Sequence, residues 1–522
     1  MNEYYMNKAS LPRSVKNQTH LRESLASWGT DRLLHVVDAC KDNDDVFRSE
    51  FGRLHNRYAN MTFLITPFLR LYLIGLLLAA NVVVAESFPV KNPASEGFSP
   101  ERLARLTQMS EQYVAQGRVA GIVNLVLRNG AVIHFESTGT RGAFDETPLK
   151  KDDLFRIYSM TKPITAVAAM QLYEQGKFQL SDPVAKFVPE LAELKVINSE
   201  GELEPLRRAM TMHDLLLHTT GLSYGFAPLN DVVDQRYQMA DLWASSDLDD
   251  FASRVARLPL KFQPGERWHY SIAVDITGLV VQRLSGQRFD RYLKEHIFDP
   301  LGMTDTFFEV PTEKRDRFLP NHFIDPKSGK LADTINAPEP FNYRDKVAMI
   351  DFLDVSFFSG GGGLVSTASD YARFAEMLRR GGALDGRRIL GTKTVAFMTK
   401  NHLNSETVVD IAGETPEAFR SQQHLNNLVR PDNFGNQSAS AIGRVGFGFG
   451  LGFGVVTDSA AIGIMGSDGE FNWGGAAGTV FWVDPEEELV VVSMIQLMLS
   501  PWPLRSDLKV AIYQALEESY AD

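Results

Sequence analysis

The sequence contains one cysteine, Cys40, among its 522 residues. A single cysteine cannot build a disulfide framework or a cysteine metal site, and no thiol nucleophile lies downstream of it. Basic residues are also outnumbered, because 53 Lys and Arg stand against 65 Asp and Glu and leave a net charge of −12. Without a basic excess the chain cannot neutralise phosphates, so a nucleic-acid partner is not expected.

Metal-ligand patterns are missing as well. The eleven histidines include no His-Glu-x-x-His sequence. His213 and His218 are five residues apart, a spacing that does not stack them on one face of a helix, so we interpret both as structural. We therefore expect no metal and no cofactor. The hydrophobic content of 44% and the charged content of 23% are typical of a soluble globular protein.

The first 85 residues differ from the rest of the chain. Within residues 62–85 the only charge is Arg70, and LYLIGLLLAANVVVA is an unbroken apolar run. Small residues at Val83 and Ala85 precede the polar Glu86, as a signal peptidase site requires. The same run is long enough to span a membrane.

The meaning of this run depends on where translation starts. From Met61, residues 61–85 form a secretory signal with a weakly positive start. From Met1, the run lies too far inside the chain and would act as a membrane anchor. We favour the signal, with residues 1–60 as a start-site artefact or a dispensable preface. A periplasmic or secreted protein is therefore expected.

Residues 86–522 carry the patterns of one large domain. The stretch SPERLARLTQMSEQYVAQG predicts a helix with Ser99 as its N-cap. Asn129-Gly130 then lies between two apolar runs, which is a strong signal for a β-hairpin. An amphipathic helix closes the chain.

The order of these patterns indicates the fold class. Strand and helix signals occur in residues 95–181, helical patterns dominate residues 182–355, and strands return in residues 356–522. We expect an α/β sandwich that is interrupted by a mainly helical region. Residues 404–444 hold too few apolar side chains for a core and are expected to form a loop or lid.

The stretch RIYSMTKPITAVAAMQLYEQGK places Ser159 three residues before Lys162. Residues i and i+3 share a face of a helix, so the hydroxyl and the ammonium would be neighbours. No charge occurs between Ile164 and Leu172, which predicts a helix that is buried on nearly every side and ends at Gly176. Burial disfavours the charged form of the lysine. Ser159 is therefore a candidate nucleophile beside a candidate base.

Two other serines match simple motifs. Ser506 stands three residues before Lys509, but the surrounding pattern is that of the amphipathic tail helix. Ser223 lies in Gly-x-Ser-x-Gly, the nucleophile elbow of α/β-hydrolases, yet a helical pattern precedes it where that motif requires a strand. We interpret the first match as an ordinary helix and the second as a Gly-rich turn.

Glycines stand at every second position from 446 to 454 and alternate with apolar residues. This period of two predicts a single strand with one bare face. The run contains no Gly-x-Gly-x-x-Gly register, so a nucleotide site is not expected.

Two further segments supply groups that Ser159 would need. Tyr270 ends a loop just before a second helix, and a nearby lysine ammonium would ease the loss of its phenolic proton. The sequence FNWGGAAGTVF places Trp473, Gly474 and Gly475 at a strand edge, where glycines let a backbone approach a ligand. A second proton carrier and a row of backbone N–H groups would thus join the serine and the lysine.

The ordered set of motifs resembles the serine hydrolases related to class C β-lactamases and penicillin-binding proteins, and most of all the family VIII carboxylesterases. The resemblance covers roughly residues 95–520. The matching motifs are Ser159-Met160-Thr161-Lys162, Leu216-Leu217-His218-Thr219-Thr220-Gly221-Leu222, Pro264-Gly265-Glu266, Tyr270-Ser271 and Trp473-Gly474-Gly475. The resemblance implies a β-lactamase-like sandwich, in which an antiparallel sheet is flanked by helices and a mainly helical region is inserted.

The resemblance also implies roles for individual residues. Ser159 would be the nucleophile, and Lys162 and Tyr270 would handle its proton. The oxyanion hole would come from the backbone N–H groups of Ser159 and of Ala476, the residue after the Trp-Gly-Gly edge. The reaction would be acyl transfer through a covalent acyl-enzyme that water later releases.

Two departures from the β-lactamase pattern concern the substrate. Those enzymes have Tyr-x-Asn, whereas Ser271 and Ile272 follow the tyrosine here, with Asp275 three residues further. They also carry Lys-Thr-Gly where this chain has Trp473-Gly474-Gly475. A tryptophan cannot replace the cation that pairs with a β-lactam carboxylate. An indole instead offers an apolar wall to uncharged groups, so we expect these three residues to bind the substrate.

We therefore expect a serine carboxylesterase that acts on a small-molecule ester with a small or medium acyl group. Alternatives within the same superfamily are a β-lactamase, a D-amino-acid peptidase or an acyltransferase. A non-catalytic cell-wall-binding protein that keeps the fold is a further alternative, against which the intact Ser159, Lys162 and Tyr270 argue. Contact with a membrane is expected only if residues 61–85 remain as an anchor.

Overall fold

The computed structural model describes residues 87–520, apart from residues 199, 227–230, 326, 335–350, 404–407 and 411–445, with the backbone alone for 408–410. The described residues belong to one compact unit. The preface at 1–60, the signal or anchor at 61–85 and most of the loop at 404–444 lie outside the described residues and stay predictions. Within the described ranges, no helix is both long and apolar enough to cross a membrane.

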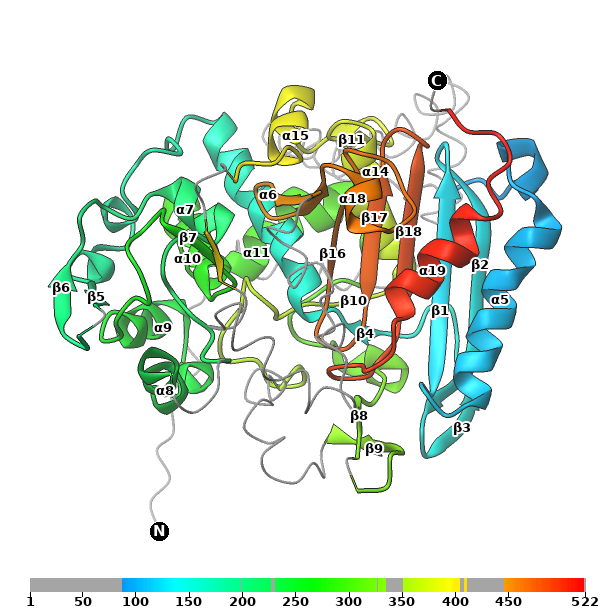
Figure 1. The fold of residues 1–522 in the computed structure, drawn as a ribbon, viewed down its shortest axis with the longest axis horizontal. Helices are drawn as coiled ribbons and strands as arrows, with labels where there is room; N and C mark the ends of the chain where they lie inside the picture. Colours follow the sequence, from blue (N-terminus) through cyan, green and yellow to red (C-terminus); the bar gives the residue numbers. More distant parts are fainter. Residues whose placement is uncertain are drawn as a thin grey trace, which may run out of the picture. The chain divides into compact units, whose positions relative to one another are not determined.

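The largest sheet of the described residues is antiparallel and lies right of centre in Figure 1. In the described residues it has eight strands, in the order β14-β15-β16-β17-β18-β1-β2-β3. Their bounds are β1 Gly121–Arg128, β2 Ala131–Gly142, β3 Asp145–Pro148, β14 Phe447–Phe449, β15 Gly454–Val456, β16 Phe471–Gly474, β17 Val480–Asp484 and β18 Leu489–Met494. The first and last parts of the domain meet where β1 pairs with β18, with Val123 opposite Met494.

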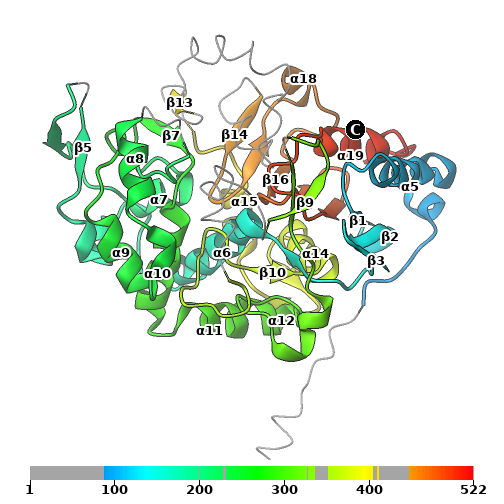
Figure 2. The same cartoon turned by 90° about the horizontal axis from the view of Figure 1, so that it is seen from below.

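Helices cover both faces of the sheet, which explains why β1 is buried along its whole length. The flanking helices are α5 Pro100–Ala115, α6 Thr161–Glu174, α14 Ala368–Arg379 and α19 Leu504–Tyr513, and α10 Ala273–Ser285 of the inserted region packs against α6. Side chains of β1 alternate between two cores, so that Ile122 and Val126 pack with α5 and α19, and Leu125 packs with α6, α10 and α14. Figure 2 shows α5 and α19 side by side, apart from α14.

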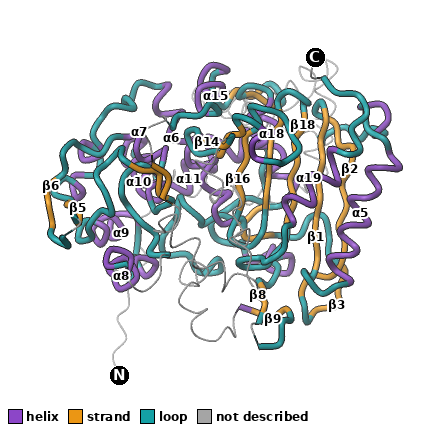
Figure 3. Tube along the Cα trace, in the orientation of Figure 1, coloured by secondary structure: helices purple, strands orange, loops and turns teal. Residues whose placement is uncertain are grey.

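The inserted region is mainly helical, as the sequence indicates, and its few strands are short (Figure 3). Its helices are α7 Met212–Leu217, α8 Val232–Met239, α9 Leu248–Val255, α11 Phe289–Leu293, a π-helical turn Lys294–Phe298 and α12 Asp299–Leu301. Its strands are β5 Lys195–Ile197, β6 Leu203–Pro205, β7 Arg267–His269, β8 His322–Ile324 and β9 Leu331–Asp333. Apart from short 3₁₀ helices, such as Tyr158–Met160, the remaining short elements are β4 Phe155–Arg156, β10 Val365–Ser366, β11 Ala383–Leu384, β12 Arg387–Arg388, β13 Val408–Asp410, α15 Thr392–Met398 and α18 Ser459–Ile462.

The predicted sandwich with its helical insertion is confirmed, and so are several local predictions. Ser99 caps α5 by accepting a hydrogen bond from the Arg102 N–H. Asn129 and Gly130 form the turn between β1 and β2, with φ values of +50° and +73°. Gly176, with φ of +70°, follows the end of α6. Each of these positions needs a conformation or a hydrogen bond that few residue types supply.

The glycine run at 446–454 is not the single strand that its period of two predicts. Phe447–Phe449 (β14) and Gly454–Val456 (β15) pair antiparallel, so the chain reverses between them. Gly452 permits this reversal because its φ of +92° lies in the left-handed region. A Cβ at this residue would lie 2.6 Å from Ala166 Cβ, so the turn also packs closely against the buried helix α6.

We predict that Gly452→Ala destabilises the protein more than the matched variant Gly176→Ala. Both glycines have positive φ, but no atom lies within 4 Å of a Cβ at Gly176. The left-handed conformation alone costs about 1–2 kcal/mol for alanine, whereas the contact with Ala166 should raise the cost at Gly452 to about 3 kcal/mol. Thermal unfolding of both variants measures this difference. Equal losses of Tm would contradict the tight packing of the turn.

Candidate active site

A strained turn places Ser159 at the entrance to helix α6. Tyr158 has φ of +40°, which is uncommon for a residue with a bulky side chain. Two contacts hold it, because Asn321 Nδ2 donates to the Tyr158 hydroxyl at 3.0 Å and Phe352 packs edge-on at a ring distance of 5.9 Å. The turn leaves Ser159 half-buried, and Lys162 follows in the first turn of the helix.

The three side chains predicted to perform catalysis lie together in the structure. The Tyr270 hydroxyl donates to Ser159 Oγ at 2.6 Å, and Lys162 Nζ donates to the same oxygen at 3.2 Å. Lys162 Nζ also lies 4.6 Å from the centre of the Tyr270 ring. Residues 111 positions apart in the chain therefore share one hydrogen-bonded group.

Lys162 is oriented by a network that begins at Asp275. Lys162 Nζ donates to the Gly361 carbonyl oxygen at 2.6 Å. The Gly361 N–H donates to Asp275 Oδ1 at 2.9 Å, and the Ser359 hydroxyl donates to the same oxygen. Asp275 lies in the first turn of α10, five residues after Tyr270. The segment at the start of α10 thus supplies two groups of the site. Tyr270 donates to Ser159, and Asp275 binds the Gly361 peptide group that accepts from Lys162.

Burial controls the charge of Lys162. Its side chain is 1% exposed, and desolvation lowers its pKa to about 7, although the Asp275 carboxylate raises it. Burial raises the pKa of Asp275, and the Lys162 ammonium lowers it. Each charge therefore stabilises the other against desolvation. A lysine whose pKa is near neutrality can accept a proton at pH 7, as a general base must.

Tyr270 is not the readily ionised phenol that the sequence led us to expect. Burial raises its pKa above the usual value, and the interactions with Ser159 and Trp473 offset only part of this rise. The physical reason is that desolvation penalises the phenolate strongly at this buried site. Tyr270 is therefore a neutral hydrogen-bond donor near pH 7, and Lys162 is the better base.

Trp473 is buried, so it does not form the exposed apolar wall that we expected beside the substrate. Its side chain is 0% exposed, and its ring lies 5.7 Å from that of Tyr270 and 5.2 Å from that of Phe449. The cause is its place on β16, where its side chain joins the main hydrophobic core. Trp473 therefore packs against Tyr270 from within the core and helps to fix the position of its ring.

An apolar surface next to the site comes instead from three aromatic rings. Tyr224 stacks nearly parallel on Phe226 at 4.8 Å and on Trp243 at 6.1 Å. Its ring also lies 5.3 Å from that of Tyr270, and Lys162 Nζ is 5.0 Å from its centre. Phe226 is 41% exposed, so these rings extend from the buried lysine to solvent.

The two predicted oxyanion donors lie on adjoining segments. A Cβ at Gly475 would lie 2.4 Å from the Ile157 carbonyl oxygen, so the end of β16 and the segment before Ser159 are in close contact. This glycine permits the approach of two backbones, and its contact with a substrate stays a prediction. Neither the N–H of Ser159 nor that of Ala476 takes part in the backbone hydrogen bonds that lie outside helices and strands in the described residues. Their role as oxyanion donors stays a prediction.

Ser223 lies in a different environment from Ser159. It is 1% exposed, its hydroxyl donates to Asp234 Oδ1 at 2.5 Å, and it lies 3.3 Å from His269 Nε2. The Gly-x-Ser-x-Gly sequence follows helix α7, as we expected, and not the strand that a nucleophile elbow requires. Its burial separates this serine from solvent and from a substrate.

The remaining candidates have structural partners. Lys509, on the tail helix α19, forms a buried ion pair with Glu470. His213 Nε2 lies 3.1 Å from His402 Nδ1, and the His218 ring packs 5.0 Å from that of Tyr270. Among the described residues, no group of three or more His, Cys, Asp or Glu is placed to hold a metal ion.

Sequence reasoning missed the residues that support the site from outside the motifs. Nothing in the sequence indicates the positive φ of Tyr158, because a bulky residue rarely adopts this conformation. The glycines at 360–363 were assigned no role at the site. Gly361 is required there, since a Cβ would lie 2.4 Å from Asp275 Oδ2. Asp275 was noted in the sequence but received no role. It acts on Lys162 through the peptide group of Gly361, which is far from both residues in the chain.

We predict that the rate of covalent labelling of Ser159 by a fluorophosphonate rises with pH through a midpoint of about 7, the pKa of Lys162. The neutral amine accepts the serine proton, so labelling is slow below this pH and constant above it. Asp275→Asn removes the charge that raises this pKa, so its midpoint should move to lower pH.

Asp370→Asn is the matched control for this measurement. Asp370 is also a buried carboxylate, but it accepts hydrogen bonds from Asp305 and Thr306. Its substitution should leave the midpoint unchanged. An Asp275→Asn midpoint at or above that of the unmodified protein would show that Asp275 does not act on Lys162.

Comparisons with known proteins agree with this geometry. A family model described as Beta-lactamase matches residues 106–515. Esterase EstB from Burkholderia gladioli is 30% identical over 417 residues, which cover 78% of this chain and 95% of that protein. Lovastatin esterase from Penicillium rubens is 30% identical over 410 residues, which cover 76% of this chain and 93% of that protein.

A solved structure shows the same fold. EstCE1, described as a hydrolase with promiscuous acyltransferase activity, matches with a TM-score of 0.62 and 24% identity over 79% of this chain and 99% of that one. The family match includes the segments that carry Ser159, Lys162 and Tyr270. The chain therefore belongs to the beta-lactamase family, and it is a serine hydrolase of that family.

Proposed function

We propose that this protein is a carboxylesterase that hydrolyses uncharged esters of small or medium acyl groups through an acyl-enzyme on Ser159. The observation that carries the proposal is the meeting of three groups at one oxygen. Ser159 Oγ receives hydrogen bonds from Tyr270 and from Lys162, and burial lowers the pKa of Lys162 to about 7. This arrangement supports nucleophilic attack at neutral pH.

In the proposed acylation step, Ser159 Oγ attacks the carbonyl carbon of the ester while its proton passes to Lys162 Nζ. The carbonyl oxygen becomes an oxyanion that the N–H groups of Ser159 and Ala476 stabilise. Tyr270 donates its proton to the departing alkoxide and regains one from Lys162, so the alcohol leaves neutral. Water then attacks the acyl-enzyme by the reverse proton route and returns Ser159 to its free form.

The surroundings of Ser159 support an uncharged substrate. The rings of Tyr224, Phe226 and Trp243 extend outward from the site, and aromatic faces bind apolar groups well. Trp473 stands where β-lactamases have a lysine that pairs with the substrate carboxylate, and an indole carries no such charge. These features favour esters over β-lactams, and the relatives named as esterases are consistent with this choice.

The first test compares turnover of p-nitrophenyl butyrate and of nitrocefin by residues 86–522 and by the Ser159→Ala variant. Ester turnover should be much faster than nitrocefin turnover and should fall at least about a thousandfold in Ser159→Ala, since the nucleophile is lost. Lys162→Ala should lose activity as well without a loss of Tm.

The same assay separates the alternatives. Dominant nitrocefin turnover would identify a β-lactamase, and turnover that depends on an added alcohol acceptor would identify an acyltransferase. Cleavage of D-alanyl-D-alanine peptides in place of esters would identify a peptidase. Absence of labelling and turnover would leave a binding protein, and unchanged activity in Ser159→Ala would mean that another residue is the nucleophile.

We further propose that the protein is exported, with cleavage at or near Glu86. The support is the apolar run within residues 61–85, with small residues at Val83 and Ala85. Intact mass of protein recovered from the periplasm or the medium should correspond to a chain that begins near Glu86. Recovery of membrane-bound protein that retains residues 61–85 would support the anchor instead.

A further inference from the structure

Four charged side chains are buried where helix α19 packs against strands β16 and β17 of the sheet. They are Arg505 and Lys509 of the helix, Glu470 next to β16, and Asp484 at the end of β17. Their exposed fractions are 8%, 4%, 1% and 0%, respectively. The desolvation of four charges is costly, so a group of this kind needs an explanation beyond stability.

The charges of this group, which we call the α19 cluster, are compensated by one another. Lys509 forms an ion pair with Glu470. The Tyr513 hydroxyl donates to Asp484 Oδ2 at 2.7 Å and lies 3.3 Å from Glu470 Oε2. Asp484 also accepts from the Ser467 hydroxyl at 2.8 Å. Two cations and two anions therefore leave the cluster without net charge.

Arg505 extends the α19 cluster to the backbone of β16. Its Nη2 donates to the Trp473 carbonyl oxygen at 2.8 Å, and its Nη1 donates to Asn472 Oδ1 at 3.4 Å. The last pair between β15 and β16 joins Gly454 to Asn472, so Trp473 lies one residue beyond the pairing with that neighbour. The Arg505 guanidinium thus binds β16 at Trp473, one residue beyond its last pairing with β15.

The segment held by Arg505 leads directly to the predicted oxyanion hole. Gly474, Gly475 and Ala476 follow Trp473, and the Gly475 N–H donates to the Thr479 carbonyl oxygen at 2.7 Å. Gly475 also lies against Ile157, two residues before the nucleophile. A shift of Trp473 along the strand would therefore move the Ala476 N–H relative to Ser159. It would also move the indole that packs against Tyr270.

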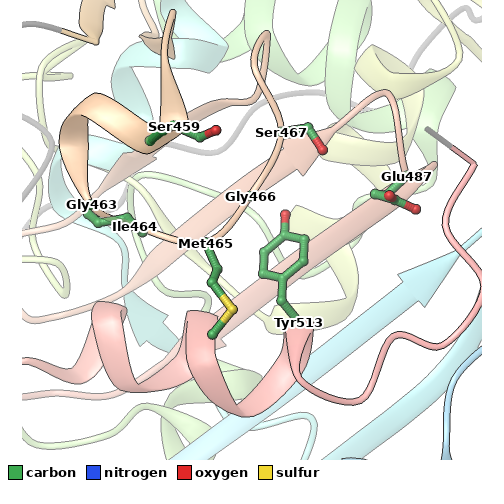
Figure 4. Close-up of a pocket in the computed structure, with 9 residues that line it drawn as sticks. Ser459, Gly463, Ile464, Met465, Gly466, Ser467, Glu487 and Tyr513 are labelled. Carbon is green, nitrogen blue, oxygen red and sulfur yellow. The ribbon is translucent and has the colours of Figure 1, made fainter. Parts of the chain in front are cut away.

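A surface pocket lies over the α19 cluster (Figure 4). Figure 4 shows Tyr513 extending from α19 beneath the chain at Gly466 and Ser467. Gly466 lines the pocket and lies against the charges, because a Cβ there would lie 2.8 Å from Glu470 Oε2.

We propose that Arg505 is a positioning residue, which holds the Trp473 carbonyl so that the Ala476 N–H points at the substrate carbonyl oxygen. The ion pair of Glu470 and Lys509 keeps the surroundings of Arg505 neutral. This inference rests on the proposed esterase function. Donors that are fixed before the reaction stabilise an oxyanion without reorganisation, so a loose strand slows acylation more than it weakens substrate binding.

The experiment measures kcat and KM for p-nitrophenyl butyrate in Arg505→Met and Arg505→Lys. Active sites are counted by fluorophosphonate labelling, so that only folded protein enters the rate. We expect kcat to fall about ten- to a hundredfold in Arg505→Met, with KM changed less than about twofold. Arg505→Lys keeps the charge and one donor, so it should recover part of kcat. It also serves as the test if Arg505→Met does not fold.

Two controls separate positioning from stability. Asp507→Asn weakens a contact of the same helix, the hydrogen bond from Tyr113, and should lower Tm while kcat stays unchanged. The double variant Glu470→Gln/Lys509→Met removes the ion pair but keeps Arg505, and its kcat should stay within about threefold of the starting value. A normal kcat in Arg505→Met, or an equal loss of kcat in Asp507→Asn, would overturn the proposal.

The failure of this inference can be told apart from the failure of the proposed function. If the unmodified protein hydrolyses the ester and Ser159→Ala does not, the function stands, and the Arg505 variants alone decide the inference. If the unmodified protein does not hydrolyse esters, the labelling rate of Ser159 by the fluorophosphonate replaces kcat, because that reaction also develops negative charge on an oxygen near Ala476. An unchanged labelling rate in Arg505→Met would then contradict the inference.

Discussion

The burial of Lys162 beside Ser159 is the interaction on which the rest of the site depends. A lysine in water is charged at neutral pH and cannot remove a proton from a serine. Helix α6 has no charge between Ile164 and Leu172, and it packs within the core, so Lys162 loses its hydration. Its pKa falls to about 7 as a result. The apolar helix is thus part of the chemistry as well as of the fold.

Two rigid supports keep this buried amine directed at the serine. On one side, the Gly361 carbonyl accepts from Lys162 and is itself held by Asp275. On the other side, Tyr270 donates to Ser159 and packs on Trp473. The neutral phenol and the partly neutral amine have separate tasks, since burial raises the pKa of the first and lowers that of the second. A pair of groups with such opposite shifts is suited to pass a proton.

The fold places these supports where they are needed. The strands β16 to β18 and β1 to β3 join the two ends of the domain in one sheet, and the inserted helical region carries Tyr270 against Trp473 of β16. The α19 cluster then stabilises β16 from the opposite side. Trp473 therefore has two contacts that matter for the site. Its ring packs against Tyr270, and its carbonyl oxygen accepts a hydrogen bond from Arg505.

The local rules of sequence were sufficient for the sandwich, the helix caps and the first hairpin, and the family resemblance implied the joint roles of Ser159, Lys162 and Tyr270. The local rules failed where a backbone conformation or a distant contact decides the outcome. The alternation of glycines at 446–454 looks like one strand, but Gly452 turns the chain. Trp473 looks like a substrate contact, but the core covers it completely.

Charge shifts show the same limit. Proximity to a lysine suggested an acidic phenol at Tyr270, whereas burial, which the sequence does not reveal, has the larger effect. Asp275 was visible in the sequence, but its link to Lys162 runs through Gly361, 86 residues away. Arg505 gave no signal at all, because an arginine on an amphipathic helix usually faces solvent.

The most direct test of the central claim is to identify the residue that carries the acyl group. The protein is mixed with p-nitrophenyl butyrate, quenched in acid within milliseconds, digested and analysed by mass spectrometry. We expect a butyryl group on Ser159, absent from the Lys162→Ala variant under the same conditions. A butyryl group on another residue, or on Ser159 at an equal level in Lys162→Ala, would contradict the central claim.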